Sequence, residues 1–197
     1  MTYLLGLTGS IGMGKSTTAQ MFADEGIPVW DADATVHKLY AAGQPAMLII
    51  ARHLPDAIVK GAVSRQQLRK LIADDPSRLD LIQRIVHPLV AADRAGFLAS
   101  QTHDIILLDI PLLYETKADA FCNGVVVVTA PAHIQRARVL ARGQMTEAEF
   151  EMILSLQMPD DQKRASADWL INTVSMDSAR KTVRAILADI RQRLVDA

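Results

Sequence analysis

Eight residues near the start of the chain, GSIGMGKS beginning at Gly9, restrict its possible folds more than any other feature. Gly9, Gly14, Lys15 and Ser16 satisfy the pattern G-x-x-x-x-G-K-[ST], in which a glycine-rich loop joins a strand to a helix. The context fits, because an apolar run at 3–8 precedes the loop and a helix-like segment follows it. This strand, loop and helix predict an α/β protein that binds a polyphosphate.

Each residue type in the loop has a chemical use beside a phosphate. Glycines let the main chain curl so that successive N–H groups point at phosphate oxygens, and the helix N-terminus adds partial positive charge. Lys15 would supply a mobile charge for the β- and γ-phosphates, and Ser16 would offer its hydroxyl to Mg²⁺, which prefers hard oxygen ligands. We therefore predict a nucleotide site with Mg²⁺. The competing interpretation is a glycine-rich turn that happens to precede a helix.

Short apolar runs alternate with helix-length segments along the chain, and continuous runs such as VVVV suit strands covered on both faces. We expect a P-loop NTPase three-layer α/β fold with a parallel sheet, closed by an amphipathic helix at Ser178–Leu194. Two mainly helical stretches interrupt the alternation, where such folds commonly place substrate lobes and lids. The expected strands are 3–8, 27–30, 105–108, 125–129 and 169–171. The expected division is a nucleotide-binding core at 1–33, 104–141 and 166–197, a helical substrate domain at 34–103 and a lid at 142–165.

Composition narrows the class of partner. Of the 197 residues, 50% are hydrophobic and the net charge is −1 with no basic block, so we expect neither nucleic acid nor a membrane surface as partner. The single cysteine, Cys122, can form no internal disulfide and is expected to be a small buried hydrophobe. No apolar run approaches the roughly 20 residues of a membrane span, and no export signal is evident. A cytoplasmic monomer is expected.

Carboxylates follow two of the predicted strands. Asp109 ends the run IILLD, where it would hold Mg²⁺; the alternative is a carboxylate that caps the strand end. Asp31 and Asp33 close the second run, and in an extended segment both would project to the side where ligands bind in α/β sheets. Asp33 could orient an acceptor hydroxyl and take its proton, or it could cap a helix at 34–41. His37 would share a helical face with Asp33, as a surface histidine or a ligand contact.

A second nucleotide motif has to be weighed. TKAD at 116–119 resembles the [NT]KxD element that reads guanine in GTPases. It follows Asp109 by only seven residues rather than ending a later strand, and Asp109 is followed by Ile-Pro-Leu instead of the D-x-x-G of a GTPase switch. A GTPase is therefore not the interpretation that we adopt.

The phosphate loop is one of several motifs that together resemble the dephospho-coenzyme A kinase family, which catalyses the last step of coenzyme A synthesis. The resemblance extends over essentially the whole chain and implies ATP and Mg²⁺ as cofactors, with dephospho-coenzyme A as the substrate. A generic kinase would not share HP and PLLYE. The motifs are GLTGSIGMGKST at 6–17, DADATVH at 31–37, VHP at 86–88, DIPLLYE at 109–115, Gln157, KRASADWLIN at 163–172 and the terminal helix.

The resemblance also implies roles for individual residues. Asp33 would be the base acting on the ribose 3′-hydroxyl, Arg142 would be a lid arginine that steadies the transferring phosphoryl group, and Asn172 would lie near the adenine. Local sequence allows other interpretations for three of the implied residues: His87 at a helix bend, Glu115 as a surface carboxylate, and Arg142 as an ordinary exposed arginine. The ATP phosphates would be bound by Gly12, Met13, Gly14, Lys15, Ser16 and Thr17, and the substrate side would comprise Asp31, Asp33, His87, Leu112, Leu113 and Glu115.

The chain departs from many relatives at three positions. Ser10 stands where they have glycine, which a small residue tolerates if its φ angle is not forced positive. Gly143 and Ile153 stand where they have Asp and Arg in the lid. Lys163 or Arg164 could supply the missing charge, although DQKR is more typical of a solvated helix face.

These observations predict an ATP-dependent kinase of dephospho-coenzyme A. The alternative within the same fold is a nucleoside or nucleotide kinase. The alternative outside catalysis is a nucleotide-sensing module that has no acceptor.

Overall fold

The computed structural model describes residues 2–143 and 145–196. The chain forms two compact units, one made of the residues up to Trp30 together with those from Thr102 on, the other of Asp31–Gln101. Among the described residues, no helix is both long and apolar enough to cross a bilayer. In chain order the elements are β1 Tyr3–Thr8, α1 Lys15–Asp24, β2 Val29–Asp31, α2 Ala32–Tyr40, α3 Pro45–His53, η1 Pro55–Ala57, β3 Ile58–Val59, β4 Ala62–Val63, α4 Arg65–Asp74, α5 Ser77–Ala99, β5 Ile105–Asp109, η2 Ala118–Phe121, β6 Gly124–Thr129, α6 Ala132–Ala141, α7 Glu147–Ser155, α8 Asp160–Ala165, β7 Trp169–Asn172 and α9 Met176–Asp196.

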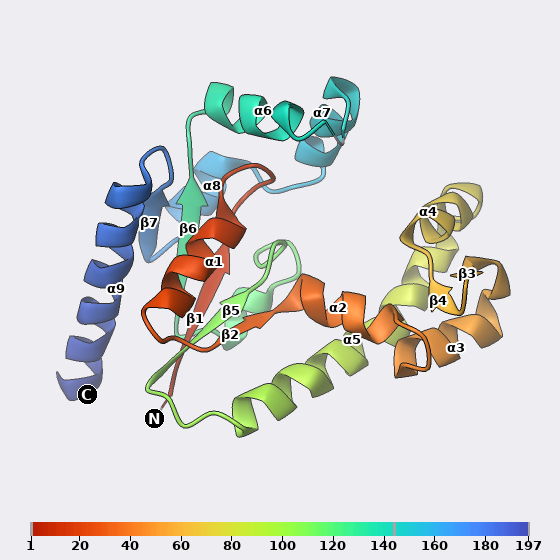
Figure 1. Cartoon of the computed structure of the whole chain (residues 1–197), viewed down its shortest axis with the longest axis horizontal. Coiled ribbons are helices and arrows are strands. Elements are labelled where there is room, and N and C mark those ends of the chain that lie inside the picture. The colour runs from red at the N-terminus through yellow and green to blue at the C-terminus, as the bar shows by residue number, and fades with distance from the viewer. Residues whose placement is uncertain (1, 144, 197) are drawn as a thin grey trace. The chain divides into compact units, whose positions relative to one another are not determined.

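The first unit is built on a five-stranded sheet with the order β2-β5-β1-β6-β7 (Figure 1). Strand β1 runs parallel to both of its neighbours, and its Leu7 lies beside Asp109 of β5 and Val126 of β6. The five apolar runs therefore form the five strands of the sheet, as predicted. Because the strands are parallel, the loops that follow β1 and β5 emerge at the same edge.

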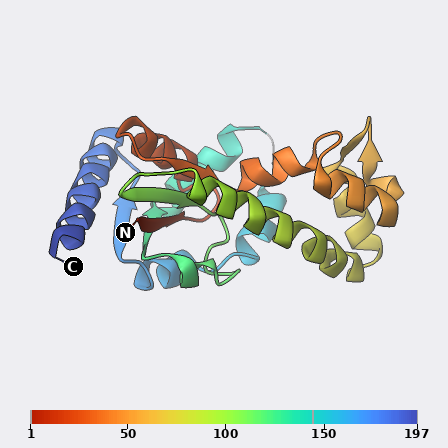
Figure 2. The same cartoon turned by 90° about the horizontal axis from the view of Figure 1, so that it is seen from below.

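Helices cover this sheet on both faces, with α1 and α8 on opposite sides (Figure 2). The terminal helix α9 packs against α1 and β7, and its Val183, Ile186 and Ile190 are buried in one core with Leu5 and Leu7 of β1. The predicted packing helix is confirmed, and it extends two residues further at each end than its apolar spacing indicated.

The second unit has an apolar core of its own, built from residues of α2, α3, α4 and α5. Between α3 and α4 it contains a small antiparallel hairpin, β3–β4, which the prediction of a mainly helical segment missed. Lys60 and Gly61 turn this hairpin with φ angles of 52° and 79°, the pair of positive values that two-residue hairpin turns favour. Each strand has only two residues, too few to show an alternating pattern in the sequence.

Candidate active site

The phosphate loop between β1 and α1 depends on two glycines in left-handed conformations. Gly12 and Gly14 have φ angles of 79° and 91°. A Cβ on Gly14 would lie 3.2 Å from the Thr173 side chain, and one on Gly12 would lie 3.0 Å from the Gln135 carbonyl. Ser10 does not share their positive φ, so a serine is tolerated there, as the sequence predicted.

An ion pair joins this loop to the end of β5. Lys15 Nζ lies 2.5 Å from Asp109 Oδ1, and the Asp109 side chain is only 3% exposed. The carboxylate at the end of IILLD therefore faces the lysine of the phosphate loop. Ser16, the next residue, is exposed at the first turn of α1.

A cavity of 260 Å³ lies beside the loop, within the first unit. Arg138 donates to the hydroxyl and the carbonyl oxygen of Thr173 at 2.9 and 2.6 Å, and the Thr173 hydroxyl donates to the Met13 carbonyl at 2.7 Å. A chain of hydrogen bonds thus connects α6 and the segment after β7 to the phosphate loop. The lining residues are Gly12, Gly14, Thr17, Thr18, Met21, Arg138, Arg142, Thr173, Met176 and Ala179.

From the sequence resemblance we expect Asn172 near the adenine, whereas Thr173 and Arg138, which line this cavity, are not among the expected residues. Asn172 is exposed, and its side-chain oxygen accepts a hydrogen bond from the Val174 N–H at 3.0 Å. Its neighbour Thr173 is the residue that lines the cavity. One signal was available, because Arg138 lies four residues before Arg142 between the last two expected strands, and on a helix this spacing places both on one face.

Arg142, the predicted lid arginine, caps the C-terminus of α6 and lines the same cavity. Gly143 follows with a φ of 64°, and its N–H donates to Leu140 O at 3.0 Å. Glycine at this position ends α6 in the left-handed conformation that is typical just past a helix C-terminus. This is the physical reason for one of the departures from the family pattern.

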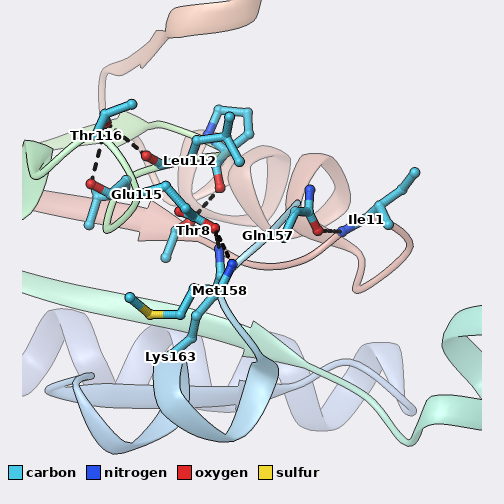
Figure 3. Close-up of polar contacts among 10 residues, drawn as sticks. Thr8, Ile11, Leu112, Glu115, Thr116, Gln157, Met158 and Lys163 are labelled. Atoms are coloured by element: carbon cyan, nitrogen blue, oxygen red, sulfur yellow. Dashed lines mark hydrogen bonds and ion pairs between the residues drawn. The ribbon is translucent and has the colours of Figure 1, made fainter. Parts of the chain in front are cut away.

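Glu115, expected on the substrate side, has its carboxylate engaged inside the first unit. Its Oε1 lies 2.8 Å from Lys163 Nζ and accepts the Met158 N–H at 2.8 Å (Figure 3). Burial opposes ionisation of Glu115, but Lys163 and the Met158 N–H outweigh it and hold the pKa of this carboxyl below its ordinary value. Lys163 is 0% exposed. The interpretation of DQKR as a solvated face is therefore wrong for Lys163, whereas Arg164 is exposed.

The two leucines before Glu115 differ in exposure. Leu112 is 41% exposed, and a ligand could contact it. Leu113 is fully buried and lies so close to Gly6 that a Cβ there would come within 2.8 Å of its Cδ1. Leu113 therefore contributes to the core of the unit in this conformation and offers no surface to a substrate.

Asp31 and Asp33 begin the second unit and have different surroundings within it. Asp31 is the N-cap of α2, and its side chain accepts the Ala34 N–H at 2.9 Å. Asp33 lies in the first turn of that helix and is exposed. The alternative in which Asp33 caps the helix is therefore wrong. The extended geometry expected for both is correct for Asp31, the last residue of β2, and wrong for Asp33, which lies in α2.

His87 lies on α5 immediately before Pro88, which is inside this helix. Both residues are exposed and, with Asp80, Gln83 and Arg84, they line a surface hollow of 520 Å³. His87 therefore sits in a polar depression of the second unit.

The donors in the first unit fit a magnesium ion. The described residues contain no cluster of three or more His, Cys, Asp or Glu side chains that could hold a metal by themselves. Asp109 and Ser16 offer one carboxylate and one hydroxyl, which are hard oxygen donors. Mg²⁺ in nucleotide sites takes few protein ligands, completing its shell with phosphate oxygens and water.

Comparison with known proteins gives consistent matches. Residues 3–178 match the family model described as dephospho-CoA kinase. The chain is 57% identical to the dephospho-CoA kinase of Cereibacter sphaeroides over 96% of both chains, and 54% identical to that of Ruegeria pomeroyi over 97% of both. The crystal structure of TT1252 from Thermus thermophilus superposes with a TM-score of 0.86 at 31% identity, covering 95% of this chain and 97% of that one.

Proposed function

The chain belongs to the dephospho-CoA kinase family, which phosphorylates dephospho-CoA with ATP in the last step of coenzyme A biosynthesis, and on that premise we propose how its residues perform the reaction. The observation that carries the proposal is the phosphate loop with Lys15 paired to Asp109 at the carboxyl edge of parallel strands. This edge of an α/β sheet is where such folds bind their ligands.

The phosphates of ATP would lie against the N–H groups of 12–17 and the Lys15 ammonium. The cavity lined by Arg138 and Thr173 supports placing the nucleoside beside the loop. Arg142 lines the same cavity, where its guanidinium would neutralise charge on the transferring phosphoryl group. Asn172 precedes Thr173 in the chain and would lie near the adenine.

Ser16 and Asp109 would hold Mg²⁺. When bound, the ion would neutralise charge on the β- and γ-phosphate oxygens. The Lys15 ammonium has three N–H donors, and we expect it to direct donors to phosphate oxygens when the nucleotide binds.

Asp33 is proposed as the base. Its carboxylate is exposed, and Asp31 rather than Asp33 caps the helix, so Asp33 is available to accept a proton. The ribose 3′-oxygen would form a bond to the γ-phosphorus as the bond from that phosphorus to the β–γ bridging oxygen breaks. The hydroxyl proton would pass to Asp33, and ADP would be the leaving group.

The substrate side would comprise Asp31, Leu112 and the hollow at His87, with Asp33 at the reacting hydroxyl. The division into core, substrate domain at 34–103 and lid at 142–165 is part of the proposal, as are a monomeric state and a cytoplasmic location. Sedimentation velocity would test the monomer.

An acceptor panel tests the function. With labelled ATP, we expect label to enter dephospho-coenzyme A and not nucleosides or nucleoside monophosphates. Label in a nucleoside or in a monophosphate would favour the alternative kinases of the same fold. Nucleotide binding without transfer to any acceptor would favour the sensing module.

A further inference from the structure

Ile11, in the first half of the phosphate loop, has both main-chain groups held by glutamine side chains. Its N–H donates to Gln157 Oε1 at 3.0 Å, and its carbonyl accepts from Gln135 Nε2 at 2.8 Å. Gln135 belongs to α6 and is 4% exposed, whereas Gln157 lies between α7 and α8. Gln135 therefore precedes the predicted lid, 142–165, Gln157 lies within it, and the two side chains meet at one residue of the loop.

The place of Gln157 is fixed by the residue after it. The Met158 N–H donates to Glu115 Oε1, the same oxygen that pairs with the fully buried Lys163 (Figure 3). An amide and an ammonium at 2.8 Å from one oxygen hold the turn between α7 and α8 against Glu115. Gln157 is thereby kept within reach of Ile11.

The segment that carries Glu115 is tied to the nucleotide site. Thr8 at the end of β1 donates its hydroxyl to Pro111 O at 2.9 Å, and Thr116 donates to Leu112 O at 2.7 Å (Figure 3). This segment begins directly after Asp109, the partner of Lys15. The contacts close a circuit from the phosphate loop through the turn after β5 to the lid and back to the loop.

These contacts would restrain the phosphate loop, whose glycines make it intrinsically flexible. Gly12 and Gly14 follow Ile11 and have the conformational freedom of residues without a Cβ. Ordering them around phosphates costs conformational entropy unless the loop is already held. Ile11 is one point at which the rest of the first unit holds it, and Met13, bonded to Thr173, is another.

We propose that Gln157 is a positioning residue for the nucleotide, and that the Glu115–Lys163 ion pair acts on ATP through Gln157 rather than on the acceptor. The inference rests on the proposed function for the identity of the nucleotide. It differs from the sequence expectation, in which Glu115 lines the substrate side, and the two assignments predict changes in different Michaelis constants.

Gln157→Met tests the proposed role of Gln157, since methionine keeps the length of the side chain and removes the oxygen acceptor. We expect the Kd for ADP and the KM for ATP to rise about fivefold, the factor expected for one neutral hydrogen bond, with the KM for dephospho-coenzyme A within twofold of wild type. Gln162→Met is the matched control, because Gln162 is an exposed glutamine of α8. The inference is overturned if Gln157→Met behaves like Gln162→Met, or if it raises the acceptor KM instead.

The combination Glu115→Gln with Lys163→Met tests the proposed role of the ion pair while leaving no buried charge alone. We expect a similar rise in the Kd for ADP, and we expect that adding Gln157→Met raises it little further, because residues of one network are not additive. Additive effects, or a rise confined to the acceptor KM, contradict the relay. Should this combination fail to fold, Gln157→Met still decides whether Gln157 positions the nucleotide.

Calorimetric titration with ADP distinguishes failure of this inference from failure of the proposed function. Wild-type protein that binds ADP but phosphorylates no acceptor would defeat the proposed function, and the effect of Gln157→Met on ADP affinity would still be measurable. Wild-type activity together with unchanged ADP affinity in Gln157→Met would defeat the inference alone.

Discussion

At the scale of single residues, two aspartates two positions apart, Asp31 and Asp33, show how local structure determines the role of a side chain. The Asp31 carboxylate accepts a hydrogen bond from the Ala34 N–H, which would otherwise have no partner within the first turn of the helix. Asp33 lies inside that turn and is exposed. The residue proposed as the base is thus the one whose carboxylate does not cap the helix.

Replacing this base tests the assignment. In Asp33→Asn, the side chain keeps its size but can no longer accept the hydroxyl proton, so we expect kcat to fall about 10²- to 10⁴-fold with ADP affinity nearly unchanged. Steady-state kinetics and calorimetry measure the two quantities. Asp56→Asn is the control, because Asp56 is another exposed aspartate at the start of a helical turn in the second unit. Unchanged turnover in Asp33→Asn would remove Asp33 from the mechanism.

The Glu115–Lys163 ion pair predicts a pH dependence of stability. The folded state holds the pKa of Glu115 below its ordinary value, so the pair stabilises the fold above the unfolded pKa and loses this contribution as pH falls through the folded pKa. We expect the Tm of wild type to fall more steeply below about pH 4.3 than that of Glu115→Gln with Lys163→Met. Differential scanning calorimetry in a series of buffers measures the slopes.

An exposed ion pair supplies the control for this measurement. Glu25 and Arg184 also form an ion pair, with 28% and 66% of their side chains exposed. Glu25→Gln with Arg184→Met should keep the wild-type slope, because exposed pairs contribute little. Equal slopes in all three proteins would mean that the Glu115–Lys163 pair adds no acid-sensitive stability.

At the scale of elements, the phosphate loop requires glycine for two separate reasons. Gly14 has a positive φ, and a Cβ there would also press on Thr173 at 3.2 Å. Gly43 has a φ of 74° but nothing within 4 Å of an added Cβ. Comparing Gly14 with Gly43 therefore distinguishes the effect of backbone strain from the effect of crowding at the site.

Gly14→Ala and Gly43→Ala exploit this difference. Both substitutions should lower the free energy of unfolding by about 1–2 kcal/mol through left-handed strain. Only Gly14→Ala should also abolish measurable ADP binding, because its methyl group displaces Thr173 and the loop. Chemical denaturation and calorimetry give the two numbers. Intact ADP affinity in Gly14→Ala would show that the loop tolerates the added carbon.

The elements could be predicted from sequence wherever a pattern is long enough to be recognised. Apolar runs located all five strands of the sheet, and the three- and four-residue spacing located α9. The hairpin β3–β4 was missed because its strands are too short for a pattern. Contacts between distant segments leave even less trace: nothing near Lys163 indicates that the chain brings it to Glu115, and nothing near Gln157 indicates Ile11.

The same limit applied to the candidate site. The phosphate loop and Asp109 were predictable because a motif specifies each residue at a fixed spacing. Thr173 was not, and only the four-residue spacing to Arg142 pointed to Arg138, because the roles of both depend on α6 and β7 lying beside the loop. The predicted start of α2 was wrong because either aspartate of the DAD sequence could be the N-cap. The structure uses Asp31, so that Asp33 is the second residue of the helix.

At the scale of the whole molecule, each unit has its own apolar core. Structures with separate cores commonly open in separate steps. Saturation with ADP at about 100 times its Kd stabilises whichever unit binds it by ~2.7 kcal/mol. We expect hydrogen exchange to slow in β1 and α1 and to stay unchanged in the core amides of α3 and α5. Equal slowing in both units would mean that they unfold as one.

Strands β2 and β5 are neighbours in the sheet, yet the whole second unit after Asp31, residues 32–101, lies between them in the chain. The residues that we propose to bind ATP in the first unit all lie outside that stretch. A chimaera in which another helical unit replaces it should retain nucleotide affinity while acquiring a different alcohol to modify. The topology makes the strand junctions at Trp30 and Thr102 the natural grafting points for redirecting this kinase chemistry.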